Sequence, residues 1–337
     1  FYVVNALIGL GNAFQWPAYS AAITTMVPKE QYGRANGLMS LVQAGPAVVA
    51  PLLAGALLPV IKLNGILLVD IATFLLAIGA LMLVHVPPPT RTVDGQAGKG
   101  NLWHEATFGF KYIFARPSLL GYVILLFFAN LFLGFPNSVH VPMVLLRTDN
   151  NSLILGAVQT AGAISWTVGS LLMSAWGGPR RRIHGALLGW IFYCLFGNII
   201  FGLGRSLGVW VPAILVAGIG SNIGVATSTA ILQAKVAPDV QGRVFSARRM
   251  LTWFPDTFTP ILGGLLADYV MEPAMQSPGW LAGLFGWMVG TDPGSGMALI
   301  MIIFGFLTIF TMLSGYLNPN IRNMEDLLPD HDQLPKA

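Results

Sequence analysis

A long internal repeat constrains the fold of this chain more than any other feature. The pattern that runs from Gly33 to Gly55 returns 209 positions later, from Gly242 to Gly264. Five pairs of positions are identical at this offset: Gly33/Gly242, Arg34/Arg243, Pro46/Pro255, Pro51/Pro260 and Gly55/Gly264. Solenoid repeats are far shorter, with units of roughly 20–50 residues. A repeat of this length in an apolar chain therefore indicates two related helix bundles with a binding site between them.

The composition is that of an all-α integral membrane protein. Hydrophobic residues make up 55% of the 337 residues and charged residues only 9%, whereas a soluble domain has about 25% charged residues. A helix needs roughly 20 apolar residues to cross the hydrocarbon core. This length predicts nine spans, near residues 3–25, 37–60, 64–84, 118–140, 153–176, 184–204, 208–233, 249–271 and 295–316.

The Lys and Arg residues orient these spans. Fifteen of the 18 fall in loops on one side, and only Lys62, Arg147 and Arg205 fall on the other. Basic loops are retained in the cytoplasm, so the first side is cytoplasmic. This role accounts for the net charge of +4, which gives no indication of nucleic-acid binding.

The repeat and the spans predict four parts. Residues 1–84 are the remainder of an N-terminal bundle, as its helices four to six, and residues 118–318 are a six-helix C-terminal bundle. The odd number of spans and the outside start predict three further helices before Phe1. Residues 85–117 are a cytoplasmic linker whose short amphipathic helix lies on the membrane surface or packs against a neighbouring protein. Residues 319–337 form a cytoplasmic tail.

Several segments resemble one transporter family, the major facilitator superfamily, in its branch of proton-driven drug, macrolide and siderophore exporters. The resemblance is carried by the loop 27–38, the Gly-Pro helix 45–55, and the runs 69–75 and 155–172. It covers essentially the whole chain and implies nine of the twelve helices of a two-bundle fold. It also implies alternating access and the export of an amphiphilic small molecule in exchange for protons across a bacterial inner membrane. Residues 177–182 match a signature loop of the family but lack the acidic residue that usually precedes it.

Two carboxylates lie well inside the predicted spans, Asp256 and Asp70. A charge at mid-membrane costs roughly 2.5–3.5 kcal/mol on insertion scales, so each needs a partner, water or a proton. Both are candidates to load and release protons. The alternative, a carboxylate that bonds a helix end, is stronger for Asp70.

Three further groups of residues are candidates for the transport mechanism. Hinge positions follow the duplicated Gly-Pro pattern, although ordinary small-residue packing explains them equally well: Gly45, Pro46, Pro51, Gly55, Pro255, Pro260 and Gly264. Basic residues of cytoplasmic loops either close a gate or only orient the chain: Arg34, Arg243, Arg180 and Arg181. Aromatic and amide side chains within spans are candidates to line a cargo pocket, which is typically apolar with a few polar groups: Gln43, Phe128, Asn130, Phe132, Gln159, Trp166, Asn222 and Trp253.

The sequence gives no sign of an enzyme, a cofactor or a metal site. It has no Walker loop, its five His are scattered, and Cys194 is the only cysteine. The expected partners are small-molecule cargo, protons and the lipid bilayer, and we expect a monomer. Two alternatives stay open: a nutrient-uptake symporter of the same fold, and a non-transporting membrane partner or sensor.

Overall fold

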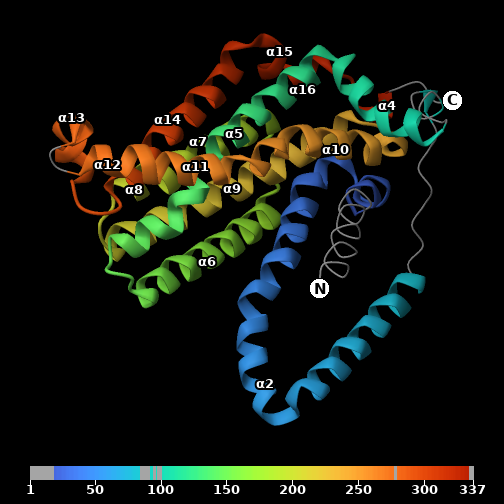
Figure 1. Cartoon of the computed structure of the whole chain (residues 1–337). Helices are drawn as coiled ribbons and strands as arrows, with labels where there is room; N and C mark the ends of the chain where they lie inside the picture. Colours follow the sequence, from blue (N-terminus) through green and yellow to red (C-terminus); the bar gives the residue numbers. More distant parts are fainter. Residues whose placement is uncertain (1–18, 84–91, 94–95, 97–100, 277–278, 334–337) are drawn as a thin grey trace.

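The computed structural model describes residues 19–83, 92, 93, 96, 101–276 and 279–333. These residues form helices and turns, and no strand occurs among them. Most helices lie together in one bundle. The helix α2 (Tyr32–Leu83) begins in this bundle, extends away from it and reverses direction at its far end (Figure 1). The turn is at Lys62, whose backbone is not helical (φ 55°, ψ −178°). It separates two helical arms at the place where the predicted spans 37–60 and 64–84 meet.

Six helices among the described residues are long and apolar enough to cross a membrane. One is the second arm of α2, Asn64–Leu83. The other five belong to the bundle: α5 (Pro117–Leu146), α6 (Ser152–Trp176), the continuous segment Arg182–Leu203, α9 (Leu207–Lys235) and α14 (Ser295–Leu317). The segment Arg182–Leu203 comprises α7 (Arg182–Tyr193), a π-helical turn (Cys194–Ile200) and α8 (Phe201–Leu203). The chain is thus an all-α, multi-pass membrane protein.

The predicted span 249–271 is not one continuous helix. The structure has α10 (Pro238–Trp253), a 3₁₀ turn (Phe254–Thr257), α11 (Thr259–Leu266), a π-helical turn (Ala267–Met271) and α12 (Glu272–Met275). Pro255 and Pro260 flank the first break, where the missing N–H groups prevent two helical hydrogen bonds. The first copy of the repeat differs, because α2 remains helical through Pro46 and Pro51. Beyond α12, the short helix α13 (Trp280–Val289) precedes α14.

Small residues allow the bundle helices to approach closely. Gly189 of α7 faces the backbone of α9, where an added Cβ would lie 2.5 Å from the Gly224 nitrogen and 2.6 Å from the Gly220 carbonyl oxygen. In lipid, such contacts replace the hydrophobic effect as a source of helix association. Near the start of α9, Trp210 is fully buried and donates to the Phe201 carbonyl at 3.1 Å.

Two charged side chains, the partly buried Arg147 and the buried Glu272, tie the ends of helices together at the end of the bundle predicted to face outward. The Arg147 guanidinium donates to the carbonyls of Gly202 (2.9 Å), Gly204 (2.5 Å) and Val289 (2.9 Å). The Glu272 carboxylate accepts from the backbone of Gly294 (3.1 Å) and Met297 (2.8 Å) at the start of α14. An acidic group is favourable at this end of a helix because the N–H groups there have no helical partner.

The linker helix and the tail both pack on the cytoplasmic side of the bundle. Linker helix α4 (Leu102–Phe114) is capped by Asn101, whose side chain accepts from the His104 N–H, and it packs against α10 of the same chain. Its contact surface includes Gly109, which lies against the backbone of Arg243. The tail contains α15 (Pro319–Arg322), α16 (Met324–Leu327) and a 3₁₀ turn (His331–Gln333).

The close approach of α7 and α9 predicts a large effect of one methyl group. Gly189→Ala introduces a Cβ that overlaps backbone atoms, so we expect a loss of about 1–3 kcal/mol from overpacking. The apparent melting temperature in detergent should fall. Gly156→Ala is the matched control, because no atom lies within 4 Å of the added Cβ and Ala has the higher helix propensity. Equal melting temperatures for the two variants would contradict this account of the packing.

Candidate cytoplasmic gate

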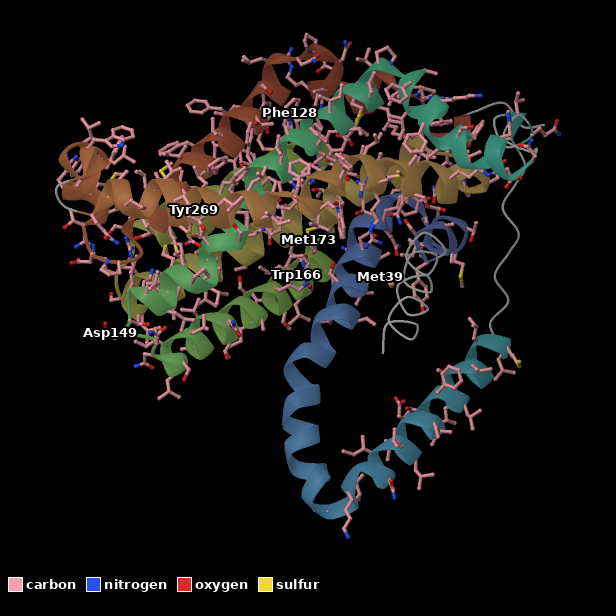
Figure 2. All side chains as sticks on the ribbon, in the orientation of Figure 1. Met39, Phe128, Asp149, Trp166, Met173 and Tyr269 are labelled. Atoms are coloured by element: carbon pink, nitrogen blue, oxygen red, sulfur yellow. The ribbon has the colours of Figure 1, made fainter. Side chains whose placement is uncertain are left out.

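The two copies of the repeated loop meet at the cytoplasmic end of the bundle. The first copy begins at a 3₁₀ turn (Lys29–Gln31) and continues into α2, which packs against α6 and α9. Tyr32 is buried against Ala230 and Ala234 of α9. Gly37 lies so close to Met173 and Ser174 of α6 that a Cβ would stand 2.6 Å from the Ser174 nitrogen. Figure 2 shows Met173 beside the start of α2.

A buried network of amide and hydroxyl side chains joins the two copies; we call it the amide clasp. Its members are Ser20, Thr24 and Asn36, which lie before or within the first copy, and Gln233 and Gln241, which lie just before the second. Asn36 Nδ2 donates to Gln233 Oε1 at 2.6 Å, and Gln233 Nε2 donates to the Ser20 hydroxyl at 3.0 Å. Thr24 donates to Gln241 Oε1 at 3.1 Å. The clasp therefore satisfies buried polar groups only while the two copies are together.

The clasp repeats one contact at the offset of the duplication. Thr24 and Gln233 are 209 positions apart, as are Tyr32 and Gln241. The Tyr32 hydroxyl donates to the Thr24 carbonyl at 3.4 Å, and Gln241 Nε2 donates to the Gln233 carbonyl at 3.1 Å. In each copy, a side chain thus bonds the carbonyl eight residues earlier. Our reading of the sequence missed this cluster, although extending the 209-residue offset back from Gly33 would have paired these positions.

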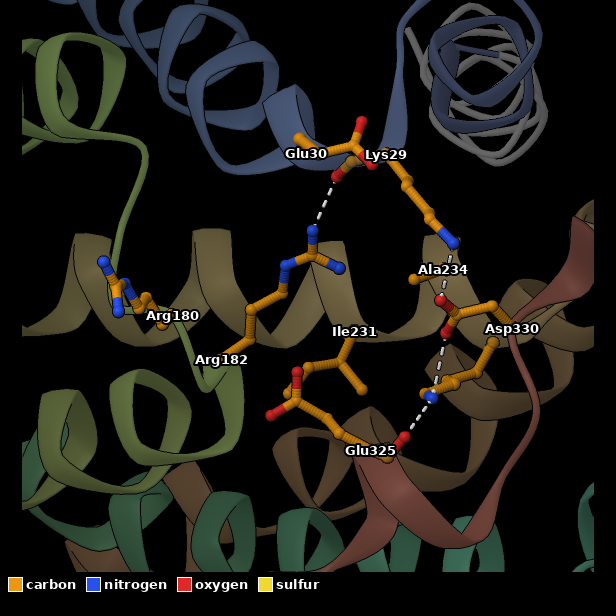
Figure 3. Close-up of a pocket in the computed structure, with 9 residues that line it drawn as sticks. Lys29, Glu30, Arg180, Arg182, Ile231, Ala234, Glu325 and Asp330 are labelled. Atoms are coloured by element: carbon orange, nitrogen blue, oxygen red, sulfur yellow. Dashed lines mark hydrogen bonds and ion pairs between the residues drawn. The ribbon is translucent and has the colours of Figure 1, made fainter.

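A group of charged side chains, which we call the ionic shell, consists of Lys29, Arg182, Lys235, Asp330 and Asp332; Figure 3 labels Lys29, Arg182 and Asp330. Arg182 donates to the Lys29 carbonyl at 2.5 Å. Lys29 pairs with Asp330 at 2.9 Å and with Asp332 at 2.8 Å. Lys235 pairs with the other oxygen of Asp330 at 2.9 Å. Together with Glu30, Arg180 and Glu325, all of these side chains except Asp332 line a cavity of about 220 Å³.

The pairing shifts the ionisation of these groups. The hydrogen bonds that Lys29 donates to the Asp332 and Asp330 carboxylates raise the pKa of this lysine above its usual value. Burial opposes the ionisation of Asp330, but hydrogen bonds from Lys235 and Lys29 outweigh it and lower the pKa of this carboxyl. The hydrogen bond from Lys29 also lowers the pKa of Asp332. All three groups are therefore charged at neutral pH.

The predicted gate arginines have four different environments. Arg34 is exposed, with its side chain against Gly177, which has a left-handed backbone (φ 85°). Arg180 lies at the cavity described above. Arg181 pairs with Asp326 of the tail at 3.3 Å. Arg243 pairs with Glu105 of α4 at 3.4 Å. The acidic partner that the sequence 177–182 lacks is thus supplied by the tail.

The structure does not bring the two predicted proton carriers together. Asp70 lies on the second arm of α2, where its side chain is exposed and has no hydrogen bond or ion pair to a described residue. Asp256 lies in the 3₁₀ turn that separates α10 from α11, and it is also exposed. The two carboxylates are therefore on separate elements.

The predicted cargo residues do not form one pocket. Asn222 is buried and donates to Ser170 at 2.8 Å, which joins α9 to α6, while Asn130 donates to the Leu126 carbonyl of its own helix at 2.9 Å. Phe128 on α5 and Trp166 on α6 lie apart in Figure 2. Phe132 contacts Phe304 of α14 with ring centres 6.3 Å apart, Trp253 stacks under Arg249, and Gln159 is exposed. The side chain of Gln43 lies outside the described part of the structure.

The predicted hinge positions have different conformations in the two copies. Pro255 and Pro260 flank a broken helix, and Gly264 of α11 has open space around it. Gly45, Pro46, Pro51 and Gly55 lie in the continuous first arm of α2; the structure describes their backbone but not their side chains.

The fold defines a class: a multi-pass helical membrane protein, in which the segments around the two copies of a repeated loop lie against each other at the end predicted to be cytoplasmic. The family model of the Major Facilitator Superfamily matches residues 1–260, and the chain belongs to this family. It is 24% identical to macrolide efflux protein A of Streptococcus pyogenes over 271 residues, which cover 80% of this chain and 66% of that protein. It is 25% identical to macrolide efflux protein A of Enterococcus faecalis over 247 residues, or 72% and 75% of the two chains. The match thus spans just under two thirds of the Streptococcus protein. No solved structure matched the chain significantly.

Removing one clasp residue should open the cytoplasmic side. Gln241→Leu deletes the hydrogen bond from Thr24, which joins the two sides of the gate, and two bonds within the second half, to the carbonyls of Gln233 and Val236. Loss of the joining bond should weaken the closed state by about 0.5–1.5 kcal/mol. In a Cys194→Ala background, a cysteine at the buried position Ser40 should react faster with a maleimide. Asn198→Leu is the control. It removes a buried amide whose Nδ2 has no hydrogen-bond partner among the described residues, so the rate of the maleimide reaction should stay unchanged. Equal rates for both variants would refute the role of the clasp.

The ionic shell should not titrate in the physiological range. A carboxylate whose pKa is lowered in the folded protein stabilises the fold at pH values above the pKa of an unpaired Asp, about 3.9. This contribution is lost as the pH falls through the lowered pKa. Infrared difference spectra should therefore show no protonation of Asp330 and Asp332 between pH 5 and pH 8. The signal should emerge below about pH 4 and be absent in Asp330→Asn/Asp332→Asn. A carboxyl band that appears near pH 6 and is lost in this double variant would contradict the pairing.

Proposed function

We propose that the full-length protein exports an amphiphilic small molecule from the cytoplasm in exchange for protons, by alternating access. The observation that carries the proposal is the position of the contacts between its halves. The described hydrogen bonds and ion pairs that join residues 19–83 to residues 117–333 all come from residues 19–36, at the cytoplasmic end. This arrangement fits a transporter whose cytoplasmic side is closed.

The chemistry of the amide clasp suits a gate that must open and close. Each of its hydrogen bonds contributes only about 0.5–1.5 kcal/mol, because water replaces the partner when the halves separate. A small number of such bonds makes the closed state of the gate more stable than the open state by a few kcal/mol. A ligand that binds the open state moderately more tightly than the closed state can reverse a difference of this size. An apolar seal would not gain water partners in this way when it opened.

The relatives suggest the class of cargo. Two of them are named macrolide efflux protein A, and we infer a bulky, amphiphilic cargo of this kind for the present protein. Phe128, Phe132 and Trp253 are proposed to contribute to its binding surface, together with the amides of Gln43 and Gln159. The protein is proposed to be a monomer in the inner membrane of a bacterium and to act as a transporter rather than an enzyme.

The domain organisation follows the same proposal. Residues 1–84 would belong to one rocking half and residues 118–318 to the other, joined by the linker 85–117 and followed by the tail 319–337. The break at Pro255 and Pro260 would serve as a hinge in the second half, with Gly264 beside it. The corresponding positions of α2 are proposed to line the contact between the halves.

Of the two acidic candidates, Asp256 is the stronger proton carrier. It lies where a helix of the second half is interrupted, and a broken helix is the usual setting of ion sites in secondary transporters. Its exposed carboxylate could exchange protons with water in the cavity between the halves. Asp70 is the second candidate.

Everted membrane vesicles that contain the full-length protein would test transport and its direction. A labelled macrolide should accumulate inside the vesicles when a pH gradient is applied, and the accumulation should collapse when a protonophore is added. Uptake of the same compound into intact cells would indicate the symporter instead. No movement of any amphiphilic compound in either system would favour a non-transporting role and overturn the proposal.

Neutralising the proton carrier should uncouple transport. Asp256→Asn should reduce cargo-stimulated proton flux at least tenfold, since an amide cannot bind and release the proton, while cargo binding persists. Asp70→Asn should have the smaller effect. Asp268→Asn is the control, because Asp268 is exposed near the outer end of the same segment. Unchanged proton flux in both Asp256→Asn and Asp70→Asn would remove the assignment.

A further inference from the structure

The C-terminal tail is anchored firmly on the second half of the protein. Ile321 and Met324 are buried in the bundle core. The Glu325 carboxylate accepts from the Ile183 N–H at 3.0 Å, at the start of α7. Arg181 pairs with Asp326 nearby. These contacts hold α15 and α16 against the second half whatever the position of the first half.

Lys235 fixes the path of the tail beyond α16. This lysine ends α9, and its side chain is only 7% exposed. Its ammonium donates to the carbonyl of Glu325 and, at 2.6 Å, to that of Leu328. It also pairs with Asp330. One cation thus binds both the backbone and the Asp330 side chain of the same tail segment.

The end of the tail then crosses to the first half. Asp330 is shared between Lys235 of the second half and Lys29 of the first, through different carboxylate oxygens. Asp332 adds a second pair with Lys29. The ring of His331 lies 3.2 Å from the Tyr32 hydroxyl, measured from Nε2. Figure 3 shows the ion pair between Lys29 and Asp330, the first part of the bridge to Lys235.

We propose that residues 319–333 form a strap that holds the cytoplasmic gate closed. The strap stays attached to the second half, and its acidic end grips Lys29 of the first half only when the halves are together. Opening the gate would draw Lys29 and Tyr32 away from α9 and break the bridge at Asp330. The proposal rests on the gate of the proposed function, and it assigns the tail a role in setting how often that gate opens.

A distance measurement across the gate tests the strap directly. Spin labels would be placed at Gln31→Cys on the first half and Ser246→Cys on the second, in a Cys194→Ala background. Both sites are exposed, and neither belongs to the strap or the clasp. In the full-length protein in lipid nanodiscs, Asp330→Asn/Asp332→Asn should raise the population of longer distances several-fold.

A matched substitution separates the bridge from general effects on the tail. Asp326→Asn also removes one negative charge from the tail, but its partner Arg181 lies on the second half, so the distance distribution should stay as in the parent. Charge reversal adds a second test. Lys29→Glu should lengthen the distances, and Asp332→Lys in the same chain should restore part of the short population. Rescue of this kind would not arise from damage to folding.

The outcomes distinguish the strap from the proposed function. If the parent protein transports cargo but the distances are the same in all tail variants, the strap is wrong and the function stands. If the distances shift as expected but no cargo moves, the strap is supported and the export proposal fails. A shift of equal size in Asp326→Asn would also refute the strap, because it would show that tail charge alone affects the gate.

Discussion

The relative position of the two halves of this protein depends on the hydrogen-bond partners that buried amide groups require. Gln233 is fully buried where the two halves meet, and its side chain is satisfied by Asn36 and Ser20 from the other half. A buried amide without partners is costly. The closed position of the halves is therefore specified to within hydrogen-bonding distance. The cations and carboxylates of the ionic shell are then arranged around this fixed point.

The duplicated sequence does not produce two identical conformations. Both copies bear the same proline pair, yet the first runs through it as a helix and the second is broken there. Proline removes a donor in both cases, so the proline pair alone does not decide whether the helix is broken. The two copies agree better close to the loop. There, Tyr32 bonds the Thr24 carbonyl and Gln241 bonds the Gln233 carbonyl, in each case eight residues earlier. The pseudo-symmetry is thus strongest at the gate and weakens along the helices.

Much of this architecture could be predicted from the sequence. Apolar length predicted the spans of α5, α6, α9 and α14, and the fold class is confirmed by the family match. The break within 249–271 was not predicted, since apolar length does not register a lost helical hydrogen bond. The clasp was missed because single Thr, Asn and Gln residues in apolar runs follow no period. The tail contacts were missed because Lys29 and Asp330 are about 300 residues apart and surface charges choose partners only after folding.

The outer end of the C-terminal bundle has a mechanical consequence. Arg147 connects three backbone carbonyls from two segments, Gly202 and Gly204 in one and Val289 in the other, and Glu272 connects the start of α14 to the segment before it. These links prevent the helices from sliding past one another at that end. A force applied at the opposite face is consequently passed on as rotation of the whole bundle.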